Sequence, residues 1–163
     1  MANDNHATPQ WLFDAAVRLF YPFDLDVCAD AENHKCARWI TKEQDGLKQA
    51  WALKNWCNPP YSDPKPWVEK AAHESWKKRD CRTVMLLPAD LSTKWFAHCW
   101  ISASRIVALN HRVKFEGSDQ SAKFASMLVE FSSQRGTRPI VELVDLRHLI
   151  PRKEEQANAS VDA

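Results

Sequence analysis

No stretch of this sequence approaches the ~20 consecutive apolar residues that a membrane-spanning helix needs. Its first six residues, Met-Ala-Asn-Asp-Asn-His, provide neither a basic leader nor the apolar centre of a secretion signal. We therefore expect a protein that has no membrane partner and stays in the cytoplasm where it is made.

The net charge is close to zero as well, since the sequence has 22 Lys and Arg residues and 21 Asp and Glu residues. This balance excludes a polycation that coats nucleic acid by charge alone, but it leaves room for a local basic patch. Residues 64–82 carry six basic and three acidic side chains. They either face phosphates or form a solvated helix face whose cations suit the helix dipole, and the sequence favours neither.

Closely paired cysteines are missing too. The five cysteines are scattered and include no Cys-x-x-Cys pair, which is typical of reduced thiols. A zinc site made of Cys28, His34, Cys36 and Cys57 is the alternative. Because structural zinc sites bring their ligands in close pairs, we predict no metal.

Length and composition describe one globular domain. Hydrophobic residues make up 45% of the 163 positions. Folding at this length should bury roughly 70% of the unfolded chain's surface, so the core needs neither disulfides nor metal. We predict a flexible N-terminus at 1–7, a folded domain at 8–150 and a disordered, polar tail at 151–163.

Helical and extended patterns alternate along the domain. Thr8-Pro9 and Asp63-Pro64 each predict a capped helix start, and residues 95–101 predict a further helix. Apolar segments predict strands at 23–28, 55–57, 83–87, 105–109 and 127–131. This alternation is typical of an α/β domain with a largely parallel sheet, whose ligands bind at the carboxyl ends of the strands.

The most specific signal is the string from Trp56 to Ser62, Trp-Cys-Asn-Pro-Pro-Tyr-Ser. At a proline frequency of ~5%, such a string arises by chance in roughly one of several hundred chains of this length. It follows a predicted strand and precedes a predicted helix, which places it at the ligand-binding edge of the sheet. A rigid turn with a packing tyrosine is the alternative, but the complete string favours a function.

This string has the groups needed to hold an amino group. The carboxamide oxygen of Asn58 and the backbone carbonyl of Pro59 are two acceptors on a rigid segment. Tyr61 offers a flat face for a planar base that has left its helix, a contact worth about 1–3 kcal/mol. Hydrogen bonds from an adenine amino group to both acceptors would free its lone pair for in-line attack on a sulfonium methyl, through orientation and electrostatics rather than a general base.

An ordered series of segments adds a family resemblance. These segments are Thr8 to Leu12, Leu25 to Ala29, Asp45 to Leu47, Trp56 to Ser62, Leu86 to Ala89, Arg112 to Phe115 and Ser126 to Val129. Together they resemble the small DNA N6-adenine methyltransferases of bacteriophages and prophages, the phage Dam-type family. The resemblance implies an abbreviated Rossmann-like methyltransferase fold in a single α/β domain. It also implies S-adenosyl-L-methionine as cofactor, double-stranded DNA as partner and the cytoplasm of a bacterial host cell as location.

The resemblance assigns roles to individual residues. The catalytic motif that holds the target amino group would consist of Asn58, Pro59, Pro60 and Tyr61. The cofactor would be bound by Thr8, Pro9, Trp11, Asp26, Ala29 and Asp45. Arg112 and Lys114 match a basic segment that would meet phosphates, with a solvated hairpin as the equal alternative, and Lys65 is a third candidate for DNA binding.

The sequence also departs from the usual methyltransferase pattern. Such enzymes commonly carry a glycine-rich loop after the first strand, whereas none of the three glycines here lies near Asp26, so cofactor contact must use a different backbone. Only 32 positions separate Asp26 from Asn58, so the early part of the sheet must be abbreviated. The chain has no room for a separate target-recognition domain. Sequence specificity must come from short loops, from residues 110–125 or from a second subunit in a homodimer.

Two other functions remain open at this point. The Asn-Pro-Pro-Tyr arrangement also serves enzymes that methylate an RNA base or the side-chain amide of a protein glutamine. A catalytically inactive relative that binds DNA or cofactor is the second, prompted by the missing glycine-rich loop. The intact motif argues against the inactive relative, whereas its chemistry does not separate the methyl acceptors. The family resemblance leads us to predict a site-specific, adenine-specific DNA methyltransferase that flips its target base.

Overall fold

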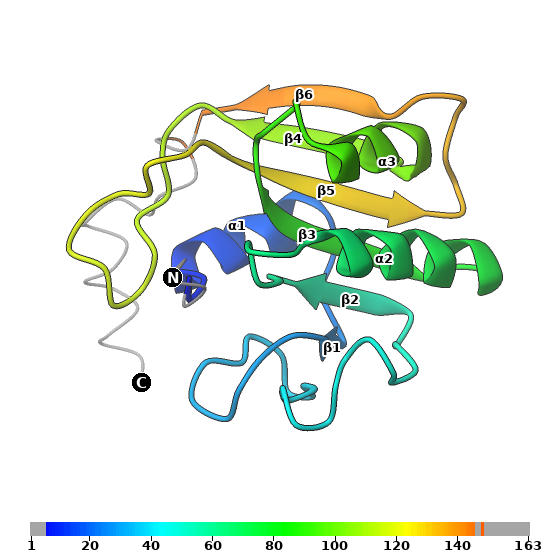
Figure 1. The fold of residues 1–163 in the computed structure, drawn as a ribbon, viewed down its shortest axis with the longest axis horizontal. Helices are drawn as coiled ribbons and strands as arrows, with labels where there is room; N and C mark the ends of the chain where they lie inside the picture. Colours follow the sequence, from blue (N-terminus) through cyan, green and yellow to red (C-terminus); the bar gives the residue numbers. More distant parts are fainter. Residues whose placement is uncertain (1–5, 146–147, 149–163) are drawn as a thin grey trace.

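Six strands form one mixed sheet in the part of the chain that the computed structural model describes, residues 6–145 and 148. The spatial order is β1-β2-β3-β5-β4-β6 (Figure 1). The strands are β1 (Leu25–Asp26), β2 (Lys54–Cys57), β3 (Arg82–Pro88), β4 (Arg105–Leu109), β5 (Ser126–Ser132) and β6 (Ile140–Val144). Helices α2 (Lys65–Lys77) and α3 (Lys94–Ser102) cover one face, and α1 (Gln10–Leu19) covers the other.

Strand direction is less uniform than the sequence predicts. Strands β1, β2 and β3 pair in parallel, and β4 pairs in parallel with β6. Strand β5 runs antiparallel to both β3 and β4, because its connection from β4 is a helix-free loop rather than a crossover. The mixed α/β single domain is therefore confirmed in outline. The prediction omitted β6, and it made the first strand, at 23–28, longer than the two residues of β1.

The early part of the sheet is abbreviated, as the spacing between Asp26 and Asn58 predicts. In the described structure β1 is followed directly by β2, and the connection between them holds turns and one isolated bridge, from Asp26 to Trp39. Short connecting turns therefore stand at the carboxyl end of β1, where a longer unit would place a helix. This leaves room beside β1 for the cavity described below.

Helix starts differ from the predicted side-chain caps. Helix α1 begins after Pro9 and α2 after Pro64, and neither has a side-chain cap hydrogen bond. The predicted caps at Thr8 and Asp63 are therefore wrong. The carbonyl of Pro9 accepts the amide hydrogens of Leu12 and Phe13 instead, and Thr8 is buried at 2% exposure.

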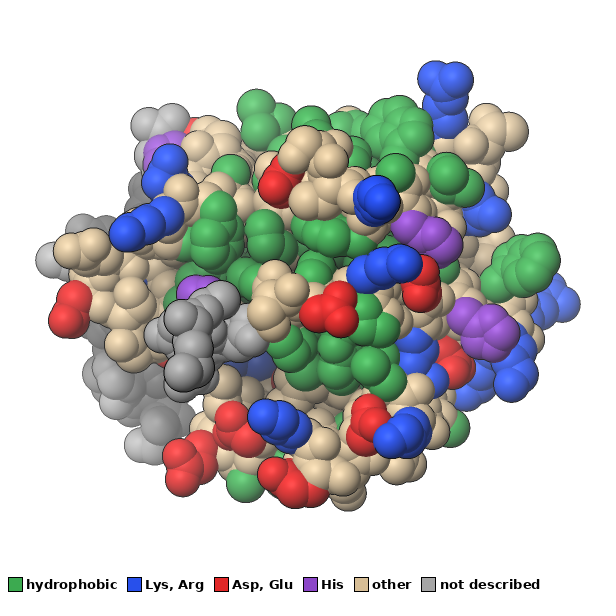
Figure 2. All heavy atoms as spheres, viewed as in Figure 1, with side chains coloured by type: hydrophobic (Ala, Val, Ile, Leu, Met, Phe, Trp, Pro, Cys, Tyr) green, Lys and Arg blue, Asp and Glu red, His purple; other side chains and the backbone are tan. Residues whose placement is uncertain are grey.

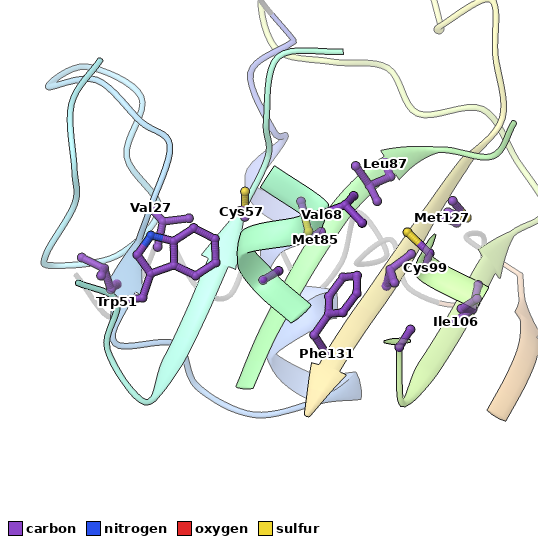
Figure 3. Close-up of a cluster of buried hydrophobic side chains, with 14 of the residues drawn as sticks. Val27, Trp51, Cys57, Val68, Met85, Leu87, Cys99, Ile106, Met127 and Phe131 are labelled. Atoms are coloured by element: carbon purple, nitrogen blue, oxygen red, sulfur yellow. The ribbon is translucent and has the colours of Figure 1, made fainter. Parts of the chain in front are cut away.

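The core consists of two clusters, one on each face of the sheet. Under α2 and α3 lie side chains such as Met85, Leu87 and Phe131 (Figure 3), and under α1 lie Val84 and Leu86. Residues of β3 thus alternate between two buried faces, which explains its continuous apolar run. Each large apolar side chain that is fully buried contributes about 1.5–3 kcal/mol, and these clusters fix the strand ends that carry the site.

The far edge of the sheet is apolar on its surface. Figure 2 shows hydrophobic side chains gathered over the region of α3 and β6. The exposed members there are Trp100, Ile101, Ile140, Val141 and Leu143. None of the described helices is both long enough and apolar enough to span a membrane.

Candidate functional site

A cavity of about 580 Å³ opens at the carboxyl ends of β1 and β2. Parallel strands end at the same edge of a sheet, so the loops that follow them surround one space. The wall is formed by the residues after β1, the turn at 41–46, the motif after β2, the first turns of the chain at 6–8 and the ring of Trp67. The cavity thus lies at the edge of the sheet where the sequence analysis expects a ligand to bind.

Asp26 is the buried acid of this cavity. It ends β1 with 2% of its surface exposed, and its carboxylate accepts the backbone amides of Cys28 (3.3 Å) and Lys35 (3.1 Å). Burial outweighs these hydrogen bonds and raises the pKa of Asp26 to about 7. A carboxylate in this setting gains most from a cationic ligand.

Asp45 and Gly46 form a tight turn against the end of β1. Asp45 has a φ of 57°, and its carboxylate accepts the amide of Leu47 (3.1 Å) and pairs with Lys48. A Cβ atom at Gly46 would lie 2.1 Å from the carbonyl oxygen of Val27, so only glycine permits this approach. One glycine thus brings a second backbone close to β1 without a glycine-rich loop.

Glu116 holds the first described residues of the chain beside the cavity by an ion pair and hydrogen bonds. Its carboxylate pairs with Lys35 (3.1 Å) and accepts the amide of Gln10 (3.0 Å), while its own amide donates to the carbonyl of Ala7 (2.9 Å). The side chain of Lys35 is only 7% exposed in this pair. Residues 6–10 are therefore held by contacts to segments far away in the sequence.

Asn58 follows β2 directly and sits where the chain start meets the cavity. Its Nδ2 donates to the backbone carbonyl of His6 at 2.6 Å. Because a carbonyl only accepts, this contact fixes which end of the carboxamide is nitrogen. Within the described residues, Oδ1 of Asn58 is buried and accepts no hydrogen bond. A buried acceptor without a donor is costly and indicates a ligand that supplies one.

Tyr61 belongs to a second, aromatic cavity of about 640 Å³. The ring centre of His6 lies 5.2 Å from that of Tyr61, and Phe124 lies 5.5 Å away. The hydroxyl of Tyr61 is buried and has no partner among the residues described, and burial raises its pKa. His6 lines both cavities, so the two spaces meet at the chain start and the motif.

Most of the predicted site residues come together. The first cavity is lined by Thr8, Asp26, Ala29, Asp45, Asn58 and Pro60. Pro59 is buried beside them, and Tyr61 lines the second cavity. Pro9 and Trp11 do not line the first cavity, since Pro9 begins α1 and Trp11 packs against the cluster under that helix.

The three predicted DNA-binding cations lie at the surface. Lys65 pairs with Glu69 at 3.7 Å, and Arg112 donates to the carbonyl of Ala122 at 3.4 Å. Lys114 is exposed, whereas its neighbours Val113 and Phe115 are buried, so this segment alternates between solvent and core.

Other cations of residues 64–82 have structural partners. Lys70 pairs with Glu74, Lys78 donates to the carbonyl of Trp51, and Arg82 donates to Gln134. These contacts support the structural interpretation of that part of the segment.

The residues of the suspected zinc site serve other contacts. Nδ1 of His34 lies 2.8 Å from the carbonyl oxygen of Cys36, and the His34 ring stacks on Trp39 at 3.8 Å. Burial raises the pKa of Cys28 to about 12. Across residues 6–145 and 148, no group of three or more His, Cys, Asp or Glu side chains is placed to hold a metal ion.

Sequence reasoning missed several residues of the site. They are His6, Lys35, Gly46, Trp67, Glu116 and Phe124. Most act through long-range contacts that leave no local pattern. Gly46 is the one residue of this set that the sequence could have indicated. The chain has only three glycines, and a glycine often stands where a side chain does not fit.

Sequence comparisons with known proteins identify the family of this chain. The family described as DNA N-6-adenine-methyltransferase (Dam) matches residues 1–153. A DNA N-6-adenine-methyltransferase of Haemophilus phage HP1 is 42% identical over 137 residues, which cover 78% of this chain and 78% of that protein. A protein with the same description from Escherichia phage T1 is 34% identical over 106 residues, or 64% of this chain and 44% of the relative. With the Asn-Pro-Pro-Tyr corner between two cavities and the match over nearly its whole length, the chain belongs to the DNA N-6-adenine-methyltransferase family.

Proposed function

We propose that this protein transfers a methyl group from S-adenosyl-L-methionine to the amino group of an adenine in double-stranded DNA. Family membership supports the reaction class. The observation that carries the proposal is the buried Oδ1 of Asn58, which has no donor among the described residues and lies on the wall of the first cavity. An exocyclic amino group supplies the missing donor.

The first cavity fits the proposed cofactor by its chemistry. Asp26 is a buried carboxylate that accepts hydrogen bonds from the backbone amides of Cys28 and Lys35, and it suits the cationic methionine part. Asp45 and Thr8 line the same space and would hold the rest of the molecule, with Asp45 toward the adenosine. When bound, S-adenosyl-L-methionine supplies an electrophilic methyl group on a sulfonium sulfur.

The protein's own groups hold and orient the target amine. Oδ1 of Asn58 and the carbonyl of Pro59 would accept its two protons, which frees the nitrogen lone pair for attack. The prolines hold both acceptors on a rigid corner, and the His6 carbonyl keeps the Asn58 carboxamide from turning. Catalysis then comes from orientation and from acceptors that are placed before the reaction begins.

Base flipping is required by the position of these groups. Because Oδ1 of Asn58 is buried, an adenine inside a duplex cannot reach it and must leave its stack. Tyr61 then offers its ring for stacking. We propose that Lys65, Arg112 and Lys114 hold the phosphates around the extruded nucleotide. Replacing Arg112 and Lys114 by Ala should reduce the salt dependence of DNA binding by about one cation per residue, as a plot of log affinity against log salt would show.

The decisive experiment identifies the methyl acceptor. The protein is incubated with methyl-labelled S-adenosyl-L-methionine and with unmethylated DNA, RNA or protein, and the labelled product is digested and identified. We expect N6-methyladenine in DNA. Label only in RNA or protein would redirect the proposal to another planar amino group, and no transfer with retained DNA or cofactor binding would identify an inactive relative.

The homodimer and the cytoplasm of a bacterial host cell stay predictions. The exposed apolar edge at β6 is the surface that a second copy would cover, because an open strand edge pairs readily with another strand. Light scattering of the purified protein measures the mass that decides between one chain and two.

A further inference from the structure

The chain after β1 forms a loop around the carboxylate of Asp26. The amide of Cys28 donates to Oδ1 at 3.3 Å and the amide of Lys35 donates to Oδ2 at 3.1 Å, so both ends of the loop contact the same side chain. His34 braces one end of the loop by stacking on Trp39, with a distance of 3.8 Å between ring centres and an angle of 8°. The side chains of this loop are therefore arranged around Asp26 before a ligand binds.

Lys35 adds a buried positive charge to the wall of the first cavity. Its side chain is 7% exposed and pairs with Glu116 at 3.1 Å. An ammonium group has three N–H donors, so this ion pair leaves donors for a further partner. Burial raises the pKa of Asp26 and the charge of Lys35 partly offsets that rise, so the two charges act on each other across the cavity wall.

Asn33 adds a buried acceptor to the same wall. Its Oδ1 is buried and accepts no hydrogen bond within the described part of the chain. Oδ1 of Asn58 is the other such atom on this wall, and we have assigned it to the target amine. A buried acceptor that lacks a donor is costly, so a ligand in this cavity should supply a second donor beside Asn33.

Acidic side chains outnumber basic ones around this cavity. The charged residues that line it are four acids and two lysines, namely Asp26, Asp30, Glu43, Asp45, Lys35 and Lys42. Lys42 is exposed, whereas the side chain of Lys35 is buried. A negative group of a ligand is repelled by such a wall unless it meets a cation directly, and Lys35 is the cation placed to receive it.

We propose that Asp26, Asn33 and Lys35 form a subsite for an α-amino acid group. Asp26 and Oδ1 of Asn33 accept hydrogens of its ammonium, and Nζ of Lys35 binds its carboxylate. This inference rests on the proposed function, because S-adenosyl-L-methionine carries that group at the end of its methionine part. It adds Asn33 and Lys35 to the role already proposed for Asp26. A ligand that lacks either charge leaves a buried group of the protein unpaired, so the subsite selects the intact amino acid.

The test compares ligands that differ in this group, by calorimetric titration of the full chain without turnover. S-adenosylhomocysteine carries both charges, its decarboxylated analogue carries the ammonium alone, and methylthioadenosine carries neither. We expect the unchanged protein to bind S-adenosylhomocysteine about 10- to 100-fold more tightly than the decarboxylated analogue. A carboxylate that met no cation would be repelled by the acidic wall. Equal or tighter binding of the decarboxylated analogue would therefore overturn the proposal.

Variants assign the preference to individual residues. Lys35→Met should lose affinity for S-adenosylhomocysteine by the same factor, while its affinity for the decarboxylated analogue should not fall. Lys35→Arg keeps the charge and should keep most of the preference. Lys42→Met removes the other lysine of the wall and is the matched control, which should leave the preference unchanged. Asn33→Ala should weaken both ligands that carry the ammonium by about tenfold and leave methylthioadenosine unaffected.

An equal loss of both ammonium ligands in Lys35→Met would overturn the proposal, because it would give Lys35 a purely structural role. If that variant does not fold, the ligand comparison in the unchanged protein and in Lys35→Arg decides. The methyl-transfer assay tests the proposed function separately. Failure of all three ligands to bind would overturn the proposed cofactor together with this subsite. Binding of S-adenosylhomocysteine without a preference over the decarboxylated analogue overturns the subsite alone.

Discussion

The two cavities that share His6 as a wall differ in chemistry. The first contains the buried carboxylate of Asp26 together with Asp45, whereas the second is lined by Tyr61, Phe115 and Phe124. An acidic space suits a cationic donor molecule, and an aromatic space suits a flat and uncharged base. This small domain thus has two cavities of different chemical character with one rigid corner between them, which fits the two ligands that we propose.

The cavities also differ in how the chain builds them. The first is formed mainly by residues 26–46, which directly follow β1, with the motif added at one side. The second joins His6, the motif and the loop between β4 and β5, three segments far apart in the sequence. Changes among residues 26–46 of the first cavity should therefore affect folding and cofactor binding together, while changes in the second cavity should affect the base alone.

Asn58→Ala should have the largest effect, because it removes the buried acceptor that we propose holds the target amine. We expect turnover to fall by roughly 100-fold or more, comparable to the loss of an oxyanion-hole donor, with cofactor binding retained. Single-turnover methyl transfer and calorimetric cofactor titration measure the two quantities. Asn58→Asp is the matched variant. It keeps an acceptor, so it should lose less activity than Ala. It also places an oxygen against the His6 carbonyl, so it should stay less active than the unchanged protein. Full activity of the Ala variant would make Asn58 purely structural.

Gly46→Ala should damage the first cavity. The new Cβ would meet the Val27 carbonyl at 2.1 Å and the Trp67 ring at 3.0 Å, so the backbone must shift. We expect a loss of about 3 kcal/mol in the free energy of unfolding, near the upper end for overpacking, and weaker cofactor binding. Gly136→Ala is the control, since its nearest atom lies at 3.5 Å. Equal melting temperatures for the two variants would contradict the tight approach.

Tyr61→Ala tests the second cavity by itself. Removing the stacking ring should weaken binding of an extrahelical adenine by about 1–3 kcal/mol, while cofactor affinity stays unchanged. Tyr61→Phe should keep the ring and most of the function. If Phe were as damaging as Ala, the buried hydroxyl of Tyr61 would be the important group.

Asp26 should make cofactor binding depend on pH. Its pKa is raised to about 7 in the free fold, against an ordinary value near ~4. Between these values the folded protein holds a proton that the unfolded chain releases, so this group's contribution to stability falls as pH rises toward 7. A cationic ligand favours the charged carboxylate, so cofactor affinity should fall as pH drops below 7, by up to about tenfold per pH unit.

Asp26→Asn is the variant that checks this dependence. It should remove the pH dependence of cofactor binding and weaken that binding at pH 8. Calorimetric titrations at pH 6 and pH 8 provide the measurement. Unchanged affinity at pH 8 would show that Asp26 does not meet the cofactor's charge.

Much of the fold followed from local patterns. The strands at β2 to β5 and all three helices lie near their predicted positions, because buried strands and amphipathic helices leave periodic apolar signals. Strand β6 was missed because Ile140, Val141 and Leu143 are exposed, with no burial pattern that marks a strand. The direction of β5 was missed because direction depends on which strands lie side by side, not on the strand's own residues.

The site residues likewise divide into those that short stretches of sequence predict and those that only long-range packing places. The motif from Asn58 to Tyr61 was predicted from a rare string, and Asp26 from the family resemblance of the segment Leu25 to Ala29; both are properties of short stretches of sequence. The exclusion of Pro9 and Trp11 from the first cavity was not predictable, because the direction of a helix relative to a cavity is set by packing. The pairing of Lys35 with Glu116 across 81 positions left no sequence signal.

By itself the sequence determined the rigid acceptor corner, since two consecutive prolines limit the backbone regardless of their surroundings. It also determined which strands are buried on both faces. Only the tertiary structure decided that the chain start lies over this corner, that one glycine brings Asp45 against β1, and that His6 lines the aromatic cavity beside Tyr61. The reason is physical: these contacts join distant segments, and their geometry exists only after the sheet has brought its strand ends together.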